Sequence, residues 1–304
     1  MTSPRATHEA PFGRVLTAMV TPFTPDGELD LLAAQKVADY LIDAGNDGLV
    51  VSGTTGESPT TTVAEDGRLL EAVIEAVGDR ASIVAGVGTN DTRHSLELAR
   101  QADRLGADGL LVVSPYYSKP PQAGIIDHVE QVVDAGGGRP ALLYDIPGRT
   151  GIQYAEDTLR RLAENPSVVA VKDAVGDIRR GTRLMHETSL CFYSGDDALN
   201  LAWMAVGASG IVSVVGHAAA REYARMIEAL DQGDLASAQE INRQLLEIDR
   251  AMMTVTQGAI TAKAVLQILG VLSNRAMRSP LIEASDAEVA VLREAMKASG
   301  LLVE

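Results

Sequence analysis

The chain has 304 residues, of which 46% are hydrophobic and 22% are charged, a composition typical of a globular protein with a large core. Its 26 basic and 41 acidic residues give a formal net charge of −15. This balance argues against a nucleic acid or an anionic membrane as a partner, because both select basic surfaces.

Cys191 is the single cysteine, so no disulfide can form within the chain, and the reducing cytoplasm is the expected location. No apolar run approaches the ~20 residues that a membrane helix needs. Residues 1–11 carry scattered charges and prolines without the apolar centre of a signal peptide. We expect them to form a flexible tail.

From Arg14 onward, short apolar runs alternate with longer amphipathic stretches, the pattern of repeated strand–helix units in a parallel sheet. The expected strands lie at 15–20, 48–52, 82–86, 109–114, 141–144, 168–172, 191–194 and 210–213. The expected helices lie at 29–44, 64–77, 92–105, 122–135, 155–163, 178–186, 198–206 and 218–230. Eight such units within residues 12–232 predict a TIM (β/α)8 barrel, an α/β fold.

A doubly wound sheet is the alternative fold. It usually has fewer strands and, where it binds a dinucleotide, a Gly-x-Gly-x-x-Gly turn. Gly86 and Gly88 begin such a phrase, but Asp91 stands where the third glycine belongs. The barrel is therefore the favoured interpretation.

After Gly233 the pattern changes to helices alone, so residues 233–304 are expected to form a small C-terminal helical region. Between Ala238 and Val255 the apolar residues step by three and four. Such a stripe fits either packing on the chain's own barrel or a contact between subunits.

The strand expected at 168–172 is apolar and β-branched, and it ends in Lys172 followed by Asp173. The carboxyl ends of barrel strands face the mouth where barrel enzymes do their chemistry. A lysine between apolar walls loses hydration of its charged form, which favours the free amine that attacks a carbonyl to form a Schiff base. Lys172 is thus a candidate nucleophile; the alternative is an ion pair with Asp173 or another carboxylate.

Two loops at the same mouth carry polar groups. Residues 52–58, after the second strand, place Thr54 and Thr55 between glycines, where hydroxyl and N–H groups can converge on a carboxylate or simply cap the next helix. The loop after the fourth strand holds Tyr116 and Tyr117 among prolines. One tyrosine can reach a cavity or a neighbouring subunit, or both can pack under the loop.

Two further strand ends complete the mouth. Tyr144 ends the fifth strand, where a phenol can carry protons near a carbonyl, and Arg149 follows on a loop where it can hold a carboxylate or lie at the surface. Gly195, Asp196 and Asp197 follow the seventh strand. Helix capping explains this turn better than a metal site, because the five histidines show no paired ligand spacing.

Five motifs at matching barrel positions resemble the dihydrodipicolinate synthase family, one of the pyruvate-dependent class I aldolases that include N-acetylneuraminate lyase. They are the Gly-Thr-Thr-Gly-Glu-Ser turn, the Pro-Tyr-Tyr loop, Tyr144 five residues before Arg149-Thr150-Gly151, the Val-Lys-Asp strand end and the Ser-Gly-Asp-Asp turn. The resemblance covers nearly the whole chain. It implies condensation of pyruvate with aspartate 4-semialdehyde to 4-hydroxy-tetrahydrodipicolinate, the first committed step of diaminopimelate and lysine synthesis.

The resemblance also implies residue roles. Lys172 would form the Schiff base with pyruvate, and Tyr144, Thr54 and Tyr117 would form a proton relay. Tyr117 would enter from a neighbouring subunit, which implies at least a dimer and usually a homotetramer. The substrate-binding residues would be Thr55 for the pyruvate carboxylate, Arg149 for the carboxylate of the semialdehyde, and the backbone at Gly195 and Val212. No metal or organic cofactor is expected.

The sequence departs from the family at one place. Members inhibited by lysine carry histidine in the helix after the threonine turn and glutamate shortly after an asparagine that corresponds to Asn90. Here that helix contains Val63 and Asp66, and His94 stands at the glutamate position. We therefore predict weak or absent inhibition by lysine.

Two other functions are compatible with the same barrel. One is a sibling aldolase or lyase that acts on a sugar-derived 2-oxo acid with the same Lys172 and Tyr144. Arg149 and the double threonine favour the synthase, because a sialic acid lyase usually has serine-threonine in the turn and lacks the arginine. The other is a catalytically silent barrel that binds a small acid, which would need no imine-forming lysine.

Overall fold

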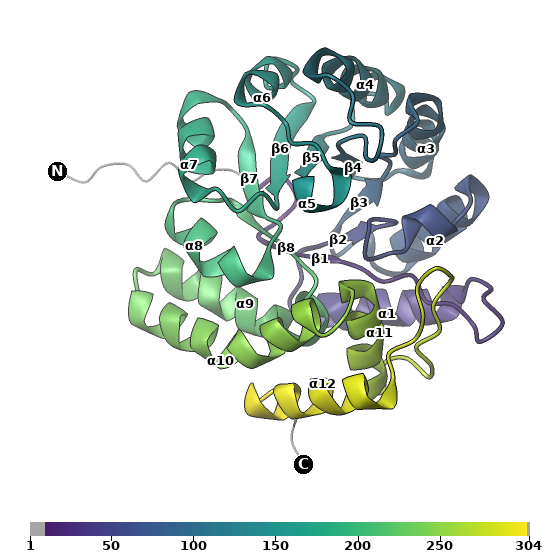
Figure 1. Cartoon of the computed structure of the whole chain (residues 1–304), viewed down its shortest axis with the longest axis vertical. Coiled ribbons are helices and arrows are strands. Elements are labelled where there is room, and N and C mark those ends of the chain that lie inside the picture. Colours follow the sequence, from purple (N-terminus) through teal and green to yellow (C-terminus); the bar gives the residue numbers. More distant parts are fainter. Residues whose placement is uncertain (1–9, 303–304) are drawn as a thin grey trace.

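Eight parallel strands close into a barrel ringed by helices in the computed structural model, which describes residues 10–302 (Figure 1). Neighbours around the barrel are neighbours in the chain: β1 (Val15–Ala18), β2 (Gly48–Val51), β3 (Ser82–Gly86), β4 (Gly109–Val113), β5 (Ala141–Asp145), β6 (Val168–Asp173), β7 (Cys191–Ser194) and β8 (Gly210–Ser213). The predicted TIM barrel is confirmed, and the doubly wound alternative is wrong, because β8 pairs with β1 and closes the sheet.

The helices follow the strands within a few residues of the predicted bounds. They are α1 (Leu31–Asp43), η1 (Ser58–Thr60), α2 (Val63–Val77), α3 (Thr92–Leu105), α4 (Gln122–Ala135), α5 (Pro147–Thr150), α6 (Glu156–Leu162), α7 (Ile178–Glu187), η2 (Asp197–Leu199), α8 (Asn200–Ala205), α9 (Gly216–Asp231), α10 (Leu235–Thr254), α11 (Gly258–Ile268) and α12 (Asp286–Ala298). The predicted flexible tail lies mostly outside the described residues. Of its members, Pro11 forms an isolated bridge with Gly13.

The segment after β5 differs from the loop that the sequence suggested. It folds as the short helix α5, because Pro147 fits the first helical turn and Gly151, with φ 74°, ends the helix in the left-handed region. The helix fixes the backbone of Arg149 relative to β5. The segment after β7 likewise begins with the 3₁₀ turn η2 before α8.

Alternate residues of each strand point into the barrel. Leu142 and Tyr144 of β5 lie in this inner core with Ala170 of β6, and Lys172, two residues beyond Ala170, is on the same side of the strand. Phe12 fills the amino-terminal end: its ring lies 6.4 Å from that of Tyr193. The carboxyl ends of the strands are therefore the end that is left for a site.

The residues that follow Tyr144 and Lys172 point outward instead. Asp145 and Asp173 are fully buried, and Arg180 of α7 bridges them with N–O distances of 2.9 and 3.1 Å. Arg180 also donates to the carbonyl of Tyr154 at 2.7 Å. Asp173 thus pairs with Arg180, so an ion pair between Lys172 and Asp173 does not explain the lysine.

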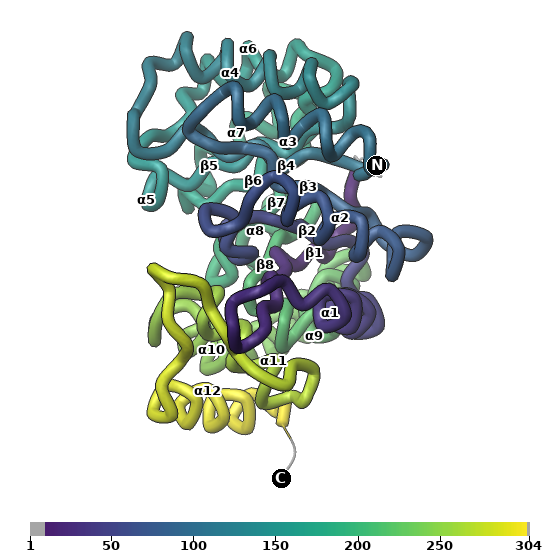
Figure 2. The backbone as a smooth tube through the Cα atoms, turned by 90° about the vertical axis from the view of Figure 1, so that its right-hand side faces the viewer, coloured from purple at the N-terminus to yellow at the C-terminus, as the bar shows by residue number. Residues whose placement is uncertain are grey.

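The C-terminal helices α10, α11 and α12 pack against one another beside α9 at one end of the molecule (Figure 2). The apolar stripe of α10 is buried there, through Ala238, Ile241, Leu245, Ile248 and Met252. It packs within its own chain, which is the first of the two alternatives. Between residues 10 and 302 no helix is both long enough and apolar enough to cross a bilayer.

Candidate active site

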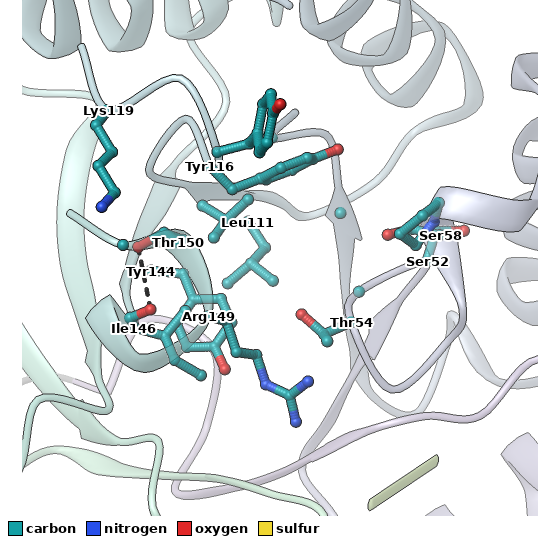
Figure 3. Close-up of a pocket in the computed structure, with 17 residues that line it drawn as sticks. Ser52, Thr54, Ser58, Leu111, Tyr116, Lys119, Tyr144, Ile146, Arg149 and Thr150 are labelled. Atoms are coloured by element: carbon teal, nitrogen blue, oxygen red, sulfur yellow. Dashed lines mark hydrogen bonds between the residues drawn. The ribbon is translucent and has the colours of Figure 1, made fainter. Parts of the chain in front are cut away.

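A cavity of about 560 Å³ opens at the carboxyl ends of β2 to β5 (Figure 3). Four of the predicted site residues line it: Thr54, Tyr117, Tyr144 and Arg149. In Figure 3 the side chains of Thr54, Tyr144 and Arg149 extend toward one common space. The other lining residues are Ser52, Gly53, Ser58, Pro59, Gly86, Gly88, Leu111, Val113, Tyr116, Lys119, Ile146, Thr150 and Gly151.

Lys172 does not line this cavity but contacts Tyr144, which does. Its side chain is 4% exposed, and its Nζ is 4.2 Å from the centre of the Tyr144 ring. The two residues are direct partners across β5 and β6. Gly195 lies on the other side, where a Cβ would sit only 2.9 Å from Lys172 Cγ and 3.1 Å from the carbonyl oxygen of Asp173. Only glycine leaves room for the lysine at this position.

Burial changes the protonation of both residues. It lowers the pKa of Lys172 to about 8; the negative charge of Asp197 opposes this shift and the Arg149 guanidinium adds to it. Burial raises the pKa of Tyr144 to about 12, with Arg149 working against it and Asp196 and Asp197 adding to it. Near neutral pH the lysine has an accessible free amine, and the tyrosine keeps its proton.

Asp197 has a larger role in the fold than the sequence suggested. Its carboxylate accepts hydrogen bonds from the Ser213 hydroxyl, from Asn200 Nδ2 at 3.0 Å and from the N–H groups of Val214 and Val215 at 2.8 and 3.1 Å. Asp197 therefore joins the loop after β7 to the end of β8. Its neighbour Asp196 does cap η2, by accepting from the N–H of Ala198.

The threonine turn is closed by its own backbone. Gly53 accepts hydrogen bonds from the N–H groups of Gly56 and Ser58, and Thr54 accepts one from Glu57. The hydroxyls of Thr54 and Thr55 take no part in these bonds. Thr54 faces the cavity, whereas Thr55 is 6% exposed and lies outside the cavity wall.

Tyr117 extends away from the chain. Its side chain is 88% exposed, its φ of 70° is in the left-handed region, and its N–H donates to the carbonyl of Thr150 at 3.2 Å. The neighbouring Tyr116 also lines the cavity. The bond to Thr150 ties the tyrosine loop to the end of α5, close to Arg149.

The structure does not bring every predicted residue to one surface. Among the described residues, Lys172, Thr55, Gly195 and Val212 are absent from the cavity wall. Gly195 contacts Lys172, while Val212 is 1% exposed in the inner barrel core with Tyr144. No cluster of three or more His, Cys, Asp or Glu side chains within residues 10–302 could hold a metal ion.

Sequence reasoning missed some residues that this site needs. The sequence analysis left open which of Tyr116 and Tyr117 reaches a cavity, gave Lys119 no role, and interpreted Asp197 as a helix cap. Glu57 and Lys263 form a buried ion pair behind the threonine turn, with an N–O distance of 2.5 Å. A lysine within the otherwise uncharged and largely apolar helix α11 was the signal that could have revealed this pair.

A parallel (β/α)8 barrel with a desolvated lysine at the end of β6 beside a tyrosine at the end of β5 defines the lysine-dependent, Schiff-base class of aldolases and lyases. Within that class, the chain belongs to the dihydrodipicolinate synthetase family, whose sequence model matches residues 11–299.

Individual relatives agree with this assignment. The 4-hydroxy-tetrahydrodipicolinate synthase of Kineococcus radiotolerans is 56% identical over 291 residues, which cover 96% of this chain and 94% of the relative. A crystal structure of the enzyme of Cyanidioschyzon merolae with lysine bound superposes with a TM-score of 0.93 at 40% identity and covers 97% of this chain and 100% of that one. A monomeric dihydrodipicolinate synthase variant gives a TM-score of 0.90 at 34% identity, with 96% and 98% covered.

Proposed function

We propose that this chain is a 4-hydroxy-tetrahydrodipicolinate synthase, which condenses pyruvate with L-aspartate 4-semialdehyde through an imine to Lys172. The observation that carries the proposal is the buried lysine beside Tyr144 at the carboxyl end of the barrel. Relatives that bear this enzyme's name cover nearly the full length of the chain, which supports the choice of substrates.

In the proposed reaction the free amine of Lys172 attacks the keto carbon of pyruvate, and water leaves as the imine forms. Loss of a methyl proton then gives an enamine, which attacks the aldehyde carbon of the semialdehyde. The amino group of the bound semialdehyde attacks the imine carbon, closes the ring and releases Lys172. Each step needs protons delivered to or taken from a buried site.

The proposed proton relay consists of Tyr144, Thr54 and Tyr117, all of which line the same cavity. Hydroxyl groups suit this work, because they pass protons without placing a net charge in the site. Tyr117 extends outward with 88% of its side chain exposed, which fits insertion into a neighbouring subunit. We therefore include a homotetramer, or at least a dimer, in the proposal.

The proposed substrate contacts use different parts of the mouth. Thr55 and the turn that holds it would bind the pyruvate carboxylate, and the backbone at Gly195 and Val212 would line the pyruvate pocket. Arg149 on α5 would hold the carboxylate of the semialdehyde with its planar fork. We also propose residues 12–232 as the catalytic barrel, residues 233–304 as the helical region, and a cytoplasmic location.

The decisive experiment compares specificity constants for the second substrate. Purified protein is assayed with pyruvate and aspartate 4-semialdehyde, and in parallel with pyruvate and sugar aldehydes. A preference of about a hundredfold for the semialdehyde, roughly 2.7 kcal/mol in the transition state, is expected, and Arg149→Met should remove most of it. A preference for a sugar aldehyde would move the chain to a sibling aldolase, and turnover of no aldehyde would leave a silent barrel.

A further inference from the structure

The threonine turn is held from outside the barrel. Glu57 ends the turn with φ 58°, a left-handed backbone conformation that is unusual for a residue with a side chain. Its carboxylate is fully buried. Oε1 forms an ion pair with Lys263 Nζ at 2.5 Å, and Oε2 accepts a hydrogen bond from the backbone N–H of Arg278 at 3.0 Å. Both partners belong to the C-terminal helical region.

The two C-terminal cations are themselves fixed. Lys263 also donates to the carbonyl of Ala276 at 2.7 Å, and Arg278 forms a fork with Glu65 at 2.6 and 3.1 Å. Phe23 lies between them, with its ring centre 4.4 Å from Lys263 Nζ and 4.4 Å from the Arg278 guanidinium. None of these groups lines the cavity.

Removing one partner of the buried Glu57–Lys263 ion pair should destabilise the folded protein. A buried carboxylate or ammonium without its partner is strongly unfavourable, and burial lowers the pKa of Lys263 to about 8 even though Glu57 acts in the opposite direction. A left-handed backbone at a residue such as Glu57 persists only where the surroundings dictate it. Movement of Lys263 would therefore be transmitted to the backbone of the turn.

We infer that Glu57, Lys263 and Arg278 act as positioning residues that hold the threonine turn, and with it Thr55, in place for the carboxylate of pyruvate. The inference rests on the proposed function, and it makes the C-terminal helical region a part of the pyruvate site although it contributes nothing to the cavity wall. Arg149 stands on α5 in the cavity wall, whereas Glu57, Lys263 and Arg278 do not line the cavity, so the effect should fall on pyruvate rather than on the semialdehyde.

The test uses Lys263→Met in the full chain, with Arg243→Met as the control. Arg243 forms its ion pair with Glu240 at the exposed surface of α10, outside the cluster. For each protein, the pyruvate concentration that half-saturates borohydride trapping and the KM for the semialdehyde are measured, together with the melting temperature. Lys263→Met should raise the pyruvate value at least tenfold and leave the semialdehyde KM within twofold. Lys263→Arg, which keeps the charge, should recover part of the loss, and Arg243→Met should behave as wild type.

The outcomes separate the two proposals. If the wild-type protein traps no pyruvate, the proposed function fails. If the wild type traps pyruvate and a folded Lys263→Met does so at the same concentration, the positioning role is wrong. If Lys263→Met does not fold, the double variant Glu57→Gln/Lys263→Met, which leaves no unpaired buried charge, is measured in the same way, and an unchanged pyruvate value in it overturns the inference.

Discussion

The Nζ of Lys172 lies 4.2 Å from the centre of the Tyr144 ring, and the two residues pair directly across β5 and β6. The ring covers the amine and helps to remove it from water, while the register of the sheet fixes their separation. The electron-rich face of an aromatic ring favours a cation, so it acts against the loss of the proton that burial promotes. Burial lowers the pKa of Lys172 to about 8.

Replacing Lys172 by alanine should abolish imine trapping. Addition of borohydride to the wild type in the presence of pyruvate should fix one pyruvate per chain on Lys172, as measured by mass spectrometry of the intact protein and its peptides. Lys36→Ala, which changes a surface lysine bonded to the carbonyl of Gly270, should trap like the wild type. Continued trapping in Lys172→Ala, for instance on Lys119 in the cavity wall, would overturn the assignment.

Replacing Tyr144 by phenylalanine should slow condensation by about 10²–10⁴-fold, the typical contribution of a positioned acid–base group. The ring that covers Lys172 is kept and only the hydroxyl is lost, so trapping of pyruvate should persist. Tyr40→Phe is the matched control, because the Tyr40 hydroxyl on α1 bonds to the carbonyl of His217 at 3.1 Å. A Tyr144→Phe protein with wild-type kcat would exclude Tyr144 from the relay.

Imine formation should follow the titration of Lys172. With a pKa of about 8, roughly a tenth of the molecules carry the free amine at pH 7, against about three in ten thousand for an ordinary lysine. The single-turnover rate with pyruvate should therefore rise with pH and level off above pH 8. Arg149→Met removes a nearby positive charge, so its profile should move to higher pH. A wild-type profile that still rises near pH 10 would contradict the shifted pKa.

Lysine should inhibit this protein weakly or not at all. Asp66 is buried and accepts a hydrogen bond from the Thr61 hydroxyl at 2.8 Å, so its carboxylate is already engaged, and Val63 offers no polar group. Lysine is titrated into the condensation assay, with the Cyanidioschyzon merolae enzyme, whose crystal structure contains lysine, as the reference. Strong inhibition of this protein at comparable concentrations would contradict the prediction.

His217 should make the fold sensitive to acid. Its Nδ1 donates to the carbonyl of Val214 at 2.8 Å and its Nε2 accepts from the N–H of Val20 at 3.2 Å, an arrangement that only the neutral ring can make. Burial lowers its pKa to about 4, below the unfolded value of about 6.5. The contribution of His217 to the free energy of unfolding is therefore complete above about pH 6.5. It is lost as the pH falls toward 4, and the loss amounts to up to about 3 kcal/mol in total.

The measurement for His217 is urea unfolding of the wild type and His217→Gln between pH 7 and pH 4.5. Glutamine can replace both hydrogen bonds but does not titrate. The stability of the wild type should fall more steeply with acid than that of the variant. Parallel curves for the two proteins would show that His217 does not carry the pH dependence.

The barrel was predictable because short apolar runs, typical of buried strands, alternate with amphipathic stretches, typical of helices. Both patterns can be recognised from residues that are close together in the sequence. Lys172 and Tyr144 were predictable because a polar residue at the tip of a buried strand has few structural uses. The roles given to the site residues and the division at residue 232 remain predictions. The family assignment, which rested on five motifs, is confirmed by the match over residues 11–299.

Other features depend on contacts between distant parts of the chain, which no local pattern records. Glu57 and Lys263 are 206 positions apart, and Asp197 binds residues at and just after the end of β8, 16 to 18 positions away. The helix α5 was missed because four residues are too few to show a helical period. The exposure of Tyr117 likewise depends on how its loop meets Thr150, which the tyrosine pair itself does not encode.

The bridge from Arg180 to Asp145 and Asp173 has a consequence for how such an enzyme can evolve. Along β5 and β6 one side of the pleat carries the proposed catalytic residues Tyr144 and Lys172. The opposite side carries the ion pairs with Arg180 that connect the two strands. Selection for a new aldehyde can therefore replace side chains around the mouth without disturbing the alignment of lysine and tyrosine.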